Sequence, residues 1–291
     1  MLQWNTTLDD RRSSSAGDSL VIDEGIGVNR TSSGQSLRIL KPRAPGWGCG
    51  AARTRIAPMS PFAELAYHVT PLGALSLRRR RMLALDLDVL EVKLGEDFLM
   101  SSLFTAGERA LAHLSVEAAP AGPLDVLVGG LGLGYTAAAA LDHDRVRSLR
   151  VVDVLPEVIA WHREGLVDLG PRLSGDPRCE LEEGDFFAMV RTGAAPQPGR
   201  FHVIAVDIDH STEAWLNAAN GDLYTEAGLA SLRAWLHPGG VFGLWSDAAP
   251  DAAFLARMAG VFARAETEVV TFANPLRDAE ETCTIYRGWA A

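Results

Sequence analysis

The sequence predicts an α/β protein with a Rossmann-like, seven-stranded doubly wound sheet and a small N-terminal β-hairpin domain in front of it. Three observations predict this fold. Short apolar strand patterns alternate with helical patterns from residue 125 onward, a glycine-rich turn follows the first of these strands, and the chain closes with an antiparallel strand pair. Alternation of this kind places helices on both faces of a parallel sheet, which binds ligands at the carboxyl ends of its strands.

The chain before residue 119 divides into an extension and a small domain. Residues 1–58 are rich in Ser, Gly, Arg and Thr without a sustained period, which predicts a disordered or non-native extension, with Met59 as a candidate initiator. Residues 59–118 are expected to form a small β-rich domain. Within it, the patterns Val89–Leu94 and Phe98–Met100 flank a turn and predict a β-hairpin.

Two further segments of this region have simpler interpretations. Helical spacing over Ala106–Val116 predicts a helix before the breaker Ala119–Pro123. The Arg78–Arg81 run is interpreted as a solvated surface, because such charge runs usually face water.

Residues 119–291 are expected to form the Rossmann-like, nucleoside-binding catalytic domain. Its predicted strands and helices follow one another along the chain in the alternating order of a doubly wound sheet. The strands are Asp125–Val128, Ser148–Val154, Cys179–Glu182, His202–Val206 and Val241–Trp245, the helices are Pro156–Leu169, Glu226–Trp235 and Asp251–Arg264, and the closing antiparallel pair is Glu268–Phe272 with Thr282–Arg287.

The glycine-rich turn is the strongest functional signal. Gly130, Gly132 and Gly134 remove side chains where the backbone turns tightly between a buried strand and a helix that begins near Thr136. The helix amides point back at the turn, a geometry that suits a nucleotide-like ligand. Asp153 ends the next strand, 19 residues after Gly134, and an acid at this distance commonly accepts hydrogen bonds from both ribose hydroxyls.

Acidic residues also end the following two strands. Gly184–Asp185 follows the third strand, where the carboxylate is expected to accept from an adenine amino group, or else to cap a helix. Asp207, Asp209 and His210 follow the fourth strand and are the catalytic candidates, because a carboxylate there neutralises an amine substrate and Asp207 or His210 takes its proton. A structural turn is the alternative interpretation. An Asp-x-Asp pair with one His is weak support for an ion, so no metal is expected.

Composition narrows the partners. The net charge is −10, and residues 82–291 alone carry −16. This acidity argues against nucleic acid and is compatible with a small-molecule amine substrate or with solubility alone. The cysteines Cys49, Cys179 and Cys283 form neither metal spacing nor a disulfide framework. Without a long apolar run or a secretory segment, we expect a cytoplasmic protein with no membrane partner.

The nucleotide is interpreted as an adenosyl sulfonium rather than NAD. Gly132–Ala137 fits the dinucleotide pattern G-x-G-x-x-G/A. However, no second domain is large enough for a hydride acceptor, and the acids after the third and fourth strands are not needed for a dinucleotide. The closing antiparallel pair is typical of S-adenosylmethionine-dependent transferases. Such a ligand needs a ribose acceptor, an adenine acceptor and an open end of strand four, and the sequence supplies all three.

The chain from about Asp88 onward resembles the spermidine synthase family of aminopropyltransferases. The segments that carry the resemblance keep their order and spacing over some 200 residues: Val126–Thr136, Val151–Ile159, Asp176–Arg178, Gly184–Asp185, Val203–Asp207, Leu223–Glu226 and Leu236–Gly240. The resemblance implies that Asp153 binds ribose, that Asp185 binds adenine and that Asp207 helps to activate the attacking amine. It also implies a class I S-adenosylmethionine-dependent transferase fold and a homodimer.

The chain departs from the family pattern at three places. Leu133 stands where the family's glycine loop carries an Asp that holds the donor's charged end. Ala106–Gly107–Glu108 matches a Tyr-His-Glu segment and keeps only the Glu, and His210–Ser211 replaces an Asp-Pro pair. The leading hypothesis is therefore a divergent transferase that moves an aminopropyl group from decarboxylated S-adenosylmethionine to a polyamine. Methyl transfer from S-adenosylmethionine and a non-catalytic adenosyl-binding module are the alternatives.

Overall fold

The computed structural model describes Leu20–Val21, residues 61–195 and residues 201–291. The prediction for the extension, residues 1–58, lies outside the described residues except at Leu20–Val21. That two-residue strand, β1, pairs in parallel with β11.

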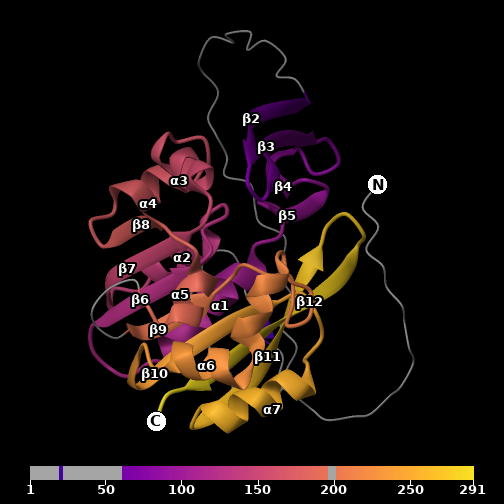
Figure 1. The fold of residues 1–291 in the computed structure, drawn as a ribbon. Helices are drawn as coiled ribbons and strands as arrows, with labels where there is room; N and C mark the ends of the chain where they lie inside the picture. The colour runs from indigo at the N-terminus through magenta and orange to yellow at the C-terminus, as the bar shows by residue number, and fades with distance from the viewer. Residues whose placement is uncertain (1–19, 22–60, 196–200) are drawn as a thin grey trace.

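The larger sheet has the order β1-β11-β12-β10-β9-β6-β7-β8. Its inner strands β7, β6, β9 and β10 run parallel, while β12 pairs antiparallel with both β10 and β11 (Figure 1). The seven strands that follow the small domain confirm the predicted doubly wound sheet, and β1 adds an eighth. Their bounds are β6 Leu124–Gly129, β7 Val146–Asp153, β8 Cys179–Glu183, β9 Phe201–Val206, β10 Leu236–Ser246, β11 Arg264–Asn274 and β12 Ala279–Trp289.

Helices cover both faces of this sheet and enclose one apolar core on each. Neighbouring residues of a strand point to opposite faces, so Val126 and Val128 belong to one core and Leu127 to the other. The first core is closed by α1 Ala106–Ala118, α2 Tyr135–Leu141, α3 Pro156–Arg163 and α4 Gly170–Gly175. The second is closed by α5 Phe186–Thr192, α6 Glu226–Arg233 and α7 Ala252–Val261.

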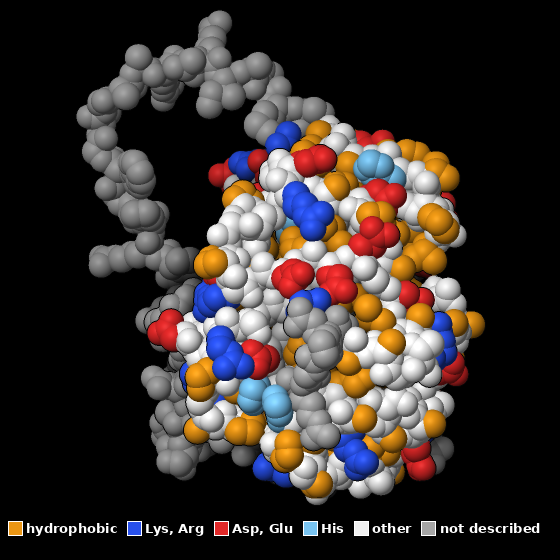
Figure 2. All heavy atoms as spheres, turned by 60° about the vertical axis from the view of Figure 1, so that its left-hand side comes forward, with side chains coloured by type: hydrophobic (Ala, Val, Ile, Leu, Met, Phe, Trp, Pro, Cys, Tyr) orange, Lys and Arg blue, Asp and Glu red, His pale blue; other side chains and the backbone are white. Residues whose placement is uncertain are grey.

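Basic and acidic side chains are interspersed over the face drawn in Figure 2. Ion pairs among the described residues include Arg172–Asp142, with an N–O distance of 2.7 Å. Within the described residues, no helix is both long and apolar enough to cross a membrane.

The small domain is a four-stranded antiparallel sheet, and the predicted single hairpin is only its second half. The predicted strands correspond to β4 Leu87–Leu94 and β5 Asp97–Ser101, whereas β2 Phe62–Thr70 and β3 Gly73–Met82 were not predicted. The Arg78–Arg81 run lies in β3 and is half-buried, so the surface predicted for it is only partly solvated. Its side chains pair with acids on neighbouring strands and turns, as Arg80 does with Glu91 and Arg78 with Glu64.

Three local differences concern helices. The predicted helix Pro156–Leu169 corresponds only to α3, which ends at Arg163, because the chain takes a left-handed conformation at Gly165, with φ of 72°. The short helix α4 begins after the predicted range and was not predicted. Neither α5 nor the 3₁₀ helix η1, Ala218–Tyr224, was predicted. The predicted helix in the small domain is α1, which packs on α2 and on β9, β10 and β12 of the large sheet.

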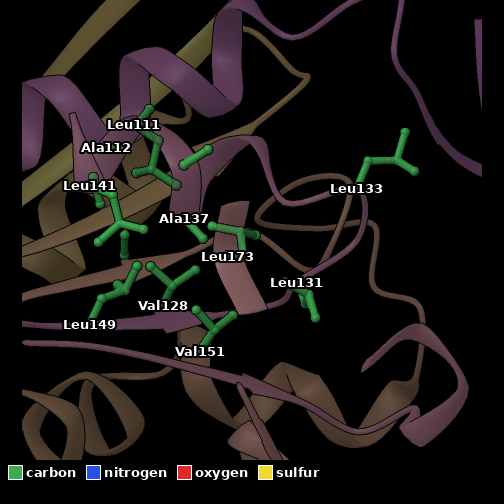
Figure 3. Close-up of a cluster of buried hydrophobic side chains, with 14 of the residues drawn as sticks. Leu111, Ala112, Val128, Leu131, Leu133, Ala137, Leu141, Leu149, Val151 and Leu173 are labelled. Atoms are coloured by element: carbon green, nitrogen blue, oxygen red, sulfur yellow. The ribbon is translucent and has the colours of Figure 1, made fainter. Parts of the chain in front are cut away.

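Figure 3 shows how α1 contributes to the first core. Leu111 and Ala112 of α1 belong to the same buried cluster as Ala137 of α2 and the strand residues Val128 and Val151. Leu133 of the glycine-rich turn lies at the right-hand side of this view, apart from the other labelled residues. The packing of α1 therefore brings the residues just after the small domain against the end of the sheet that carries the turn.

Candidate functional site

The glycine-rich turn has backbone conformations that favour glycine. Gly130 and Gly132 have φ values of 96° and 47°. A Cβ on Gly130 would lie 2.1 Å from the carbonyl oxygen of Asp207, and one on Gly132 would lie 2.4 Å from the sulfur of Met100. The turn therefore packs directly against the end of β9 on one side and the small domain on the other.

Two side chains hold the turn in place. His162 of α3 is fully buried, and its Nε2 lies 2.9 Å from the Gly132 carbonyl oxygen. Because a carbonyl only accepts, Nε2 carries the proton, and burial lowers the pKa of this imidazole. From the small domain, the Met100 thioether accepts a hydrogen bond from the Leu133 amide at 3.2 Å.

Asp153 ends β7 and joins the turn to the loop that follows. Its two carboxylate oxygens accept hydrogen bonds from the backbone amides of Leu131 and Leu155, each at 2.9 Å. Burial nevertheless raises the pKa of this carboxyl. The Gly132 amide also lowers this pKa as a further hydrogen-bond donor, and a carboxylate has about four acceptor positions, so the acceptor capacity of Asp153 is not exhausted.

Gly184 and Asp185 continue the same edge at the end of β8. The Gly184 amide donates to the Asp153 carbonyl at 2.9 Å, which ties the ends of β7 and β8 together. The Asp185 carboxylate caps α5 by accepting from the Ala188 amide at 2.8 Å, and its side chain is 49% exposed. The capping role that the sequence offered as an alternative is therefore present, and the other carboxylate oxygen, Oδ2, lies 3.9 Å from the guanidinium of Arg191.

Asp207 ends β9 directly beside the turn. The Thr136 hydroxyl donates to its Oδ2 at 2.5 Å, and the Asp207 amide donates to the Gly129 carbonyl at 2.9 Å. Burial raises the pKa of Asp207 to about 6, while the Thr136 hydrogen bond acts in the opposite direction. This carboxylate therefore ionises close to the pH at which a general base is most useful.

Glu108 of α1 supplies a second carboxyl group near Asp207. It was not among the site residues predicted from the sequence. It is 9% exposed, and burial followed by the negative charge of Asp207 raises its pKa to about 8. Burial of both groups and the repulsion between them favour a pair that holds a single negative charge near pH 7. The sequence signal was present, because Glu108 is the residue that this chain keeps from the family's Tyr-His-Glu segment.

The wall beside Glu108 is built around Gly107. A Cβ at Gly107 would lie 2.2 Å from Trp245 Nε1 and 2.8 Å from the sulfur of Cys283. Burial raises the pKa of the Cys283 thiol to about 12, so it stays neutral. Trp245 and Cys283 thus fill the space that a side chain at position 107 would need.

The other two catalytic candidates lie differently from Asp207. Asp209 is 2% exposed and accepts hydrogen bonds from the Leu216 amide, the Asn220 amide group and the Tyr224 hydroxyl, at 2.8, 2.8 and 2.9 Å. These donors give it a structural role in anchoring the segment that leads to α6. His210 is half-buried, and its carbonyl accepts from the Asp247 amide at 2.9 Å.

A groove of about 710 Å³ lies outside this group of residues. It is lined by Thr212, Trp215, Tyr224, Glu226 and Arg257 among others, and none of the predicted site residues lines it. The glycine-rich turn, with the carboxyl groups at the ends of β7, β8 and β9, remains the candidate site.

A doubly wound sheet with this turn, this row of strand-end carboxyl groups and an antiparallel closing pair defines the S-adenosylmethionine-type transferase fold. The chain belongs to the spermine/spermidine synthase family, because the model of the spermine/spermidine synthase domain matches residues 105–250. This finding confirms the resemblance predicted from the sequence.

Curated relatives carry the name polyamine aminopropyltransferase. The chain is 31% identical over 148 residues to polyamine aminopropyltransferase 2 of Pseudomonas aeruginosa, a match covering 49% of this chain and 40% of the relative. It is 26% identical over 148 residues to the polyamine aminopropyltransferase of Pyrobaculum aerophilum, covering 50% and 49%. The matches thus span half or less of the length of these relatives.

Solved structures confirm the fold. A spermidine synthase in complex with the transition-state analogue AdoDATO matches with a TM-score of 0.60 and 20% identity, covering 78% of this chain and 74% of the other. Spermidine synthase from Thermotoga maritima matches with a TM-score of 0.58 and 19% identity, covering 78% and 72%.

Proposed function

We propose that the chain is a transferase that moves an aminopropyl group from decarboxylated S-adenosylmethionine to a polyamine acceptor. Family membership and the names of the curated relatives support this activity. The observation that carries the proposal is the Asp207 carboxylate beside the glycine-rich turn, with the buried Glu108 as its neighbour.

The reaction requires the protein to position the donor and the acceptor amine and to remove one proton. The amine nitrogen attacks the carbon next to the sulfonium, the N–C bond forms as the C–S bond breaks, and a neutral thioether leaves. The attacking nitrogen then carries one proton too many, which ionised Asp207 accepts. The negative charge on the Asp207–Glu108 pair also attracts a cationic amine to this end of the site.

The donor fits the other half of the site. In this proposal the Asp153 carboxylate accepts from a ribose hydroxyl, and the half-exposed carboxylate of Asp185 accepts from an adenine amino group. The side-chain-free turn leaves room for the sulfonium. Gly130, Gly132, Gly134 and Gly184 complete the proposed binding set. Met100 contacts the turn from the small domain, so the donor would lie against or displace its thioether.

Methyl transfer from S-adenosylmethionine is the second candidate. The observation that favours it is Leu133, a buried apolar side chain, 2% exposed, at the family position of an Asp that holds the donor's charged end. Without that carboxylate, the site has one anionic contact fewer for the amino group of the decarboxylated donor.

A non-catalytic adenosyl-binding module is the third. Its basis is the Ala106–Gly107 replacement of a Tyr-His pair, and Trp245 with Cys283 closes the space at Gly107.

Product analysis separates these functions. The purified chain is incubated with decarboxylated S-adenosylmethionine or S-adenosylmethionine and a panel of diamines and polyamines, with Asp207→Asn as the control, and products are identified by mass spectrometry. Aminopropyl transfer predicts an amine heavier by one aminopropyl unit from the first donor only. Methylated product from the second donor supports the alternative, and tight binding of an adenosyl thioether without product supports the binding module.

Two further predictions concern the whole protein. A homodimer and a cytoplasmic location, with no nucleic-acid or membrane partner, remain our expectations. Sedimentation velocity of the purified chain tests the first, and fractionation of cells that produce it tests the second.

A further inference from the structure

A second group of chemically active side chains lies at the opposite end of the same strands. Asp125 is at the start of β6, His202 at the start of β9 and His237 at the start of β10. Because β6 pairs with β9 and β9 with β10, the parallel register brings three residues that are distant in sequence to one edge. The glycine-rich turn and Asp207 lie at the carboxyl ends of β6 and β9.

The three side chains are close enough to share one ligand. One ligand atom from each lies within 4.8 Å of the others, and the two imidazole rings are 4.4 Å apart between centroids. All three residues are half-buried. A tetrahedral zinc site holds its nitrogen and oxygen ligands roughly 3.4 Å apart, so side-chain movements of about 1 Å complete the geometry.

We propose that Asp125, His202 and His237 bind one divalent transition-metal ion such as Zn²⁺. A set of two imidazoles and a carboxylate suits zinc and neighbouring transition metals, whereas magnesium and calcium prefer oxygen ligands. The sequence analysis expected no metal, because the ligands do not form a local motif.

Other groups compete with the metal ion for the same atoms. Arg147 pairs with the Asp125 carboxylate, and the Ser148 hydroxyl donates to it at 2.6 Å. The Asp125 amide donates to His202 Nδ1 at 3.0 Å. Binding therefore requires the metal ion to displace Arg147 from the carboxylate, and removing that guanidinium should strengthen binding.

Calorimetric titration of the metal-free full chain with ZnCl₂ tests the site. We expect a site whose affinity falls by at least about tenfold in His237→Ala and rises severalfold in Arg147→Ala, whose side chain is 62% exposed. His113→Ala is the matched control, because His113 and His143 also form an adjacent pair, with ring nitrogens 2.9 Å apart, but are not part of this group. It should leave the affinity unchanged.

A second readout is independent of zinc bound elsewhere. Co²⁺ added to the metal-free chain should give visible absorption bands that are lost in His237→Ala and kept in His113→Ala, with a rise in Tm only where the bands appear. The proposal is overturned if the wild-type chain binds neither ion, or if His237→Ala binds both as tightly as the wild type.

Discussion

The two halves of the candidate site hold their carboxyl groups in opposite ways. At the ends of β7 and β8, Asp153 and Asp185 accept hydrogen bonds from backbone amides, which fixes the orientation of both carboxylates. At the end of β9, Asp207 has one hydroxyl donor, and Glu108 lies buried beside it. Burial raises the pKa of both Asp153 and Asp207. Several backbone amides oppose this shift at Asp153, whereas a single hydroxyl opposes it at Asp207, which leaves Asp207 better suited to proton transfer.

The largest effect should come from Asp207→Asn, which removes the proton acceptor and almost none of the volume. Loss of a general base typically costs a factor of about 10² to 10⁴ in rate, and donor binding should change little. Single-turnover rates with decarboxylated S-adenosylmethionine and the accepted amine measure the first, and calorimetry measures the second. A variant that keeps more than a tenth of the wild-type rate would remove Asp207 from the chemistry.

Substitution of Asp153 or Asp185 should lower the affinity for the donor more than it lowers the reaction rate. Asp153→Asn replaces one acceptor oxygen with a donor and should weaken the adenosyl donor by about 10- to 100-fold, with a smaller loss in kcat. Asp185→Asn, at a half-exposed side chain, should cost less. Equal losses in both variants would mean that the ribose and adenine roles are wrongly assigned.

These two halves were not equally predictable from the sequence. The turn, Asp153 and Asp185 could be located because each follows a strand whose apolar pattern is local, and parallel strands align their carboxyl ends. Glu108 meets Asp207 only because α1 packs against the sheet, and its raised pKa depends on burial that no local pattern encodes. Asp209 shares its motif with Asp207 but faces Asn220 and Tyr224, which the spacing could not reveal.

The small domain shows the same limit. Strand β3 was missed because the run Arg78–Arg81 obscures its alternation, and β2 is the strand that pairs with it. Cross-strand pairs such as Arg80–Glu91 compensate the arginine charges.

The raised pKa of the buried Glu108 should also make the free energy of unfolding depend on pH. The pKa of Glu108 is raised from 4.5 to about 8, so its contribution to stability is fully present below pH 4.5 and is lost as the pH rises through 8. Glu108→Gln has no such loss and should exceed the wild-type free energy of unfolding by about 1–3 kcal/mol at pH 8.5. Denaturant unfolding at pH 5 and 8.5 measures this difference, which should be small at pH 5. A difference independent of pH would contradict the raised pKa.

The smallest effect tests the one hydroxyl donor of Asp207. Thr136→Val removes the hydrogen bond that lowers the Asp207 pKa, so the acid limb of the pH–rate profile, near pH 6, should move upward by about half a unit to one unit. Thr212→Val, remote from Asp207, is the control and should leave the limb in place. An unchanged limb in Thr136→Val would mean that another group sets it.

Calorimetric titration of the wild-type chain and Asp153→Asn with decarboxylated S-adenosylmethionine, S-adenosylmethionine and NAD tests the nucleoside site most directly. We predict that the wild type binds at least one of the two sulfonium nucleosides and binds NAD more weakly, and that Asp153→Asn loses most of this affinity. No affinity for either sulfonium nucleoside, or equal affinity in Asp153→Asn, would contradict the assignment of the glycine-rich turn and Asp153.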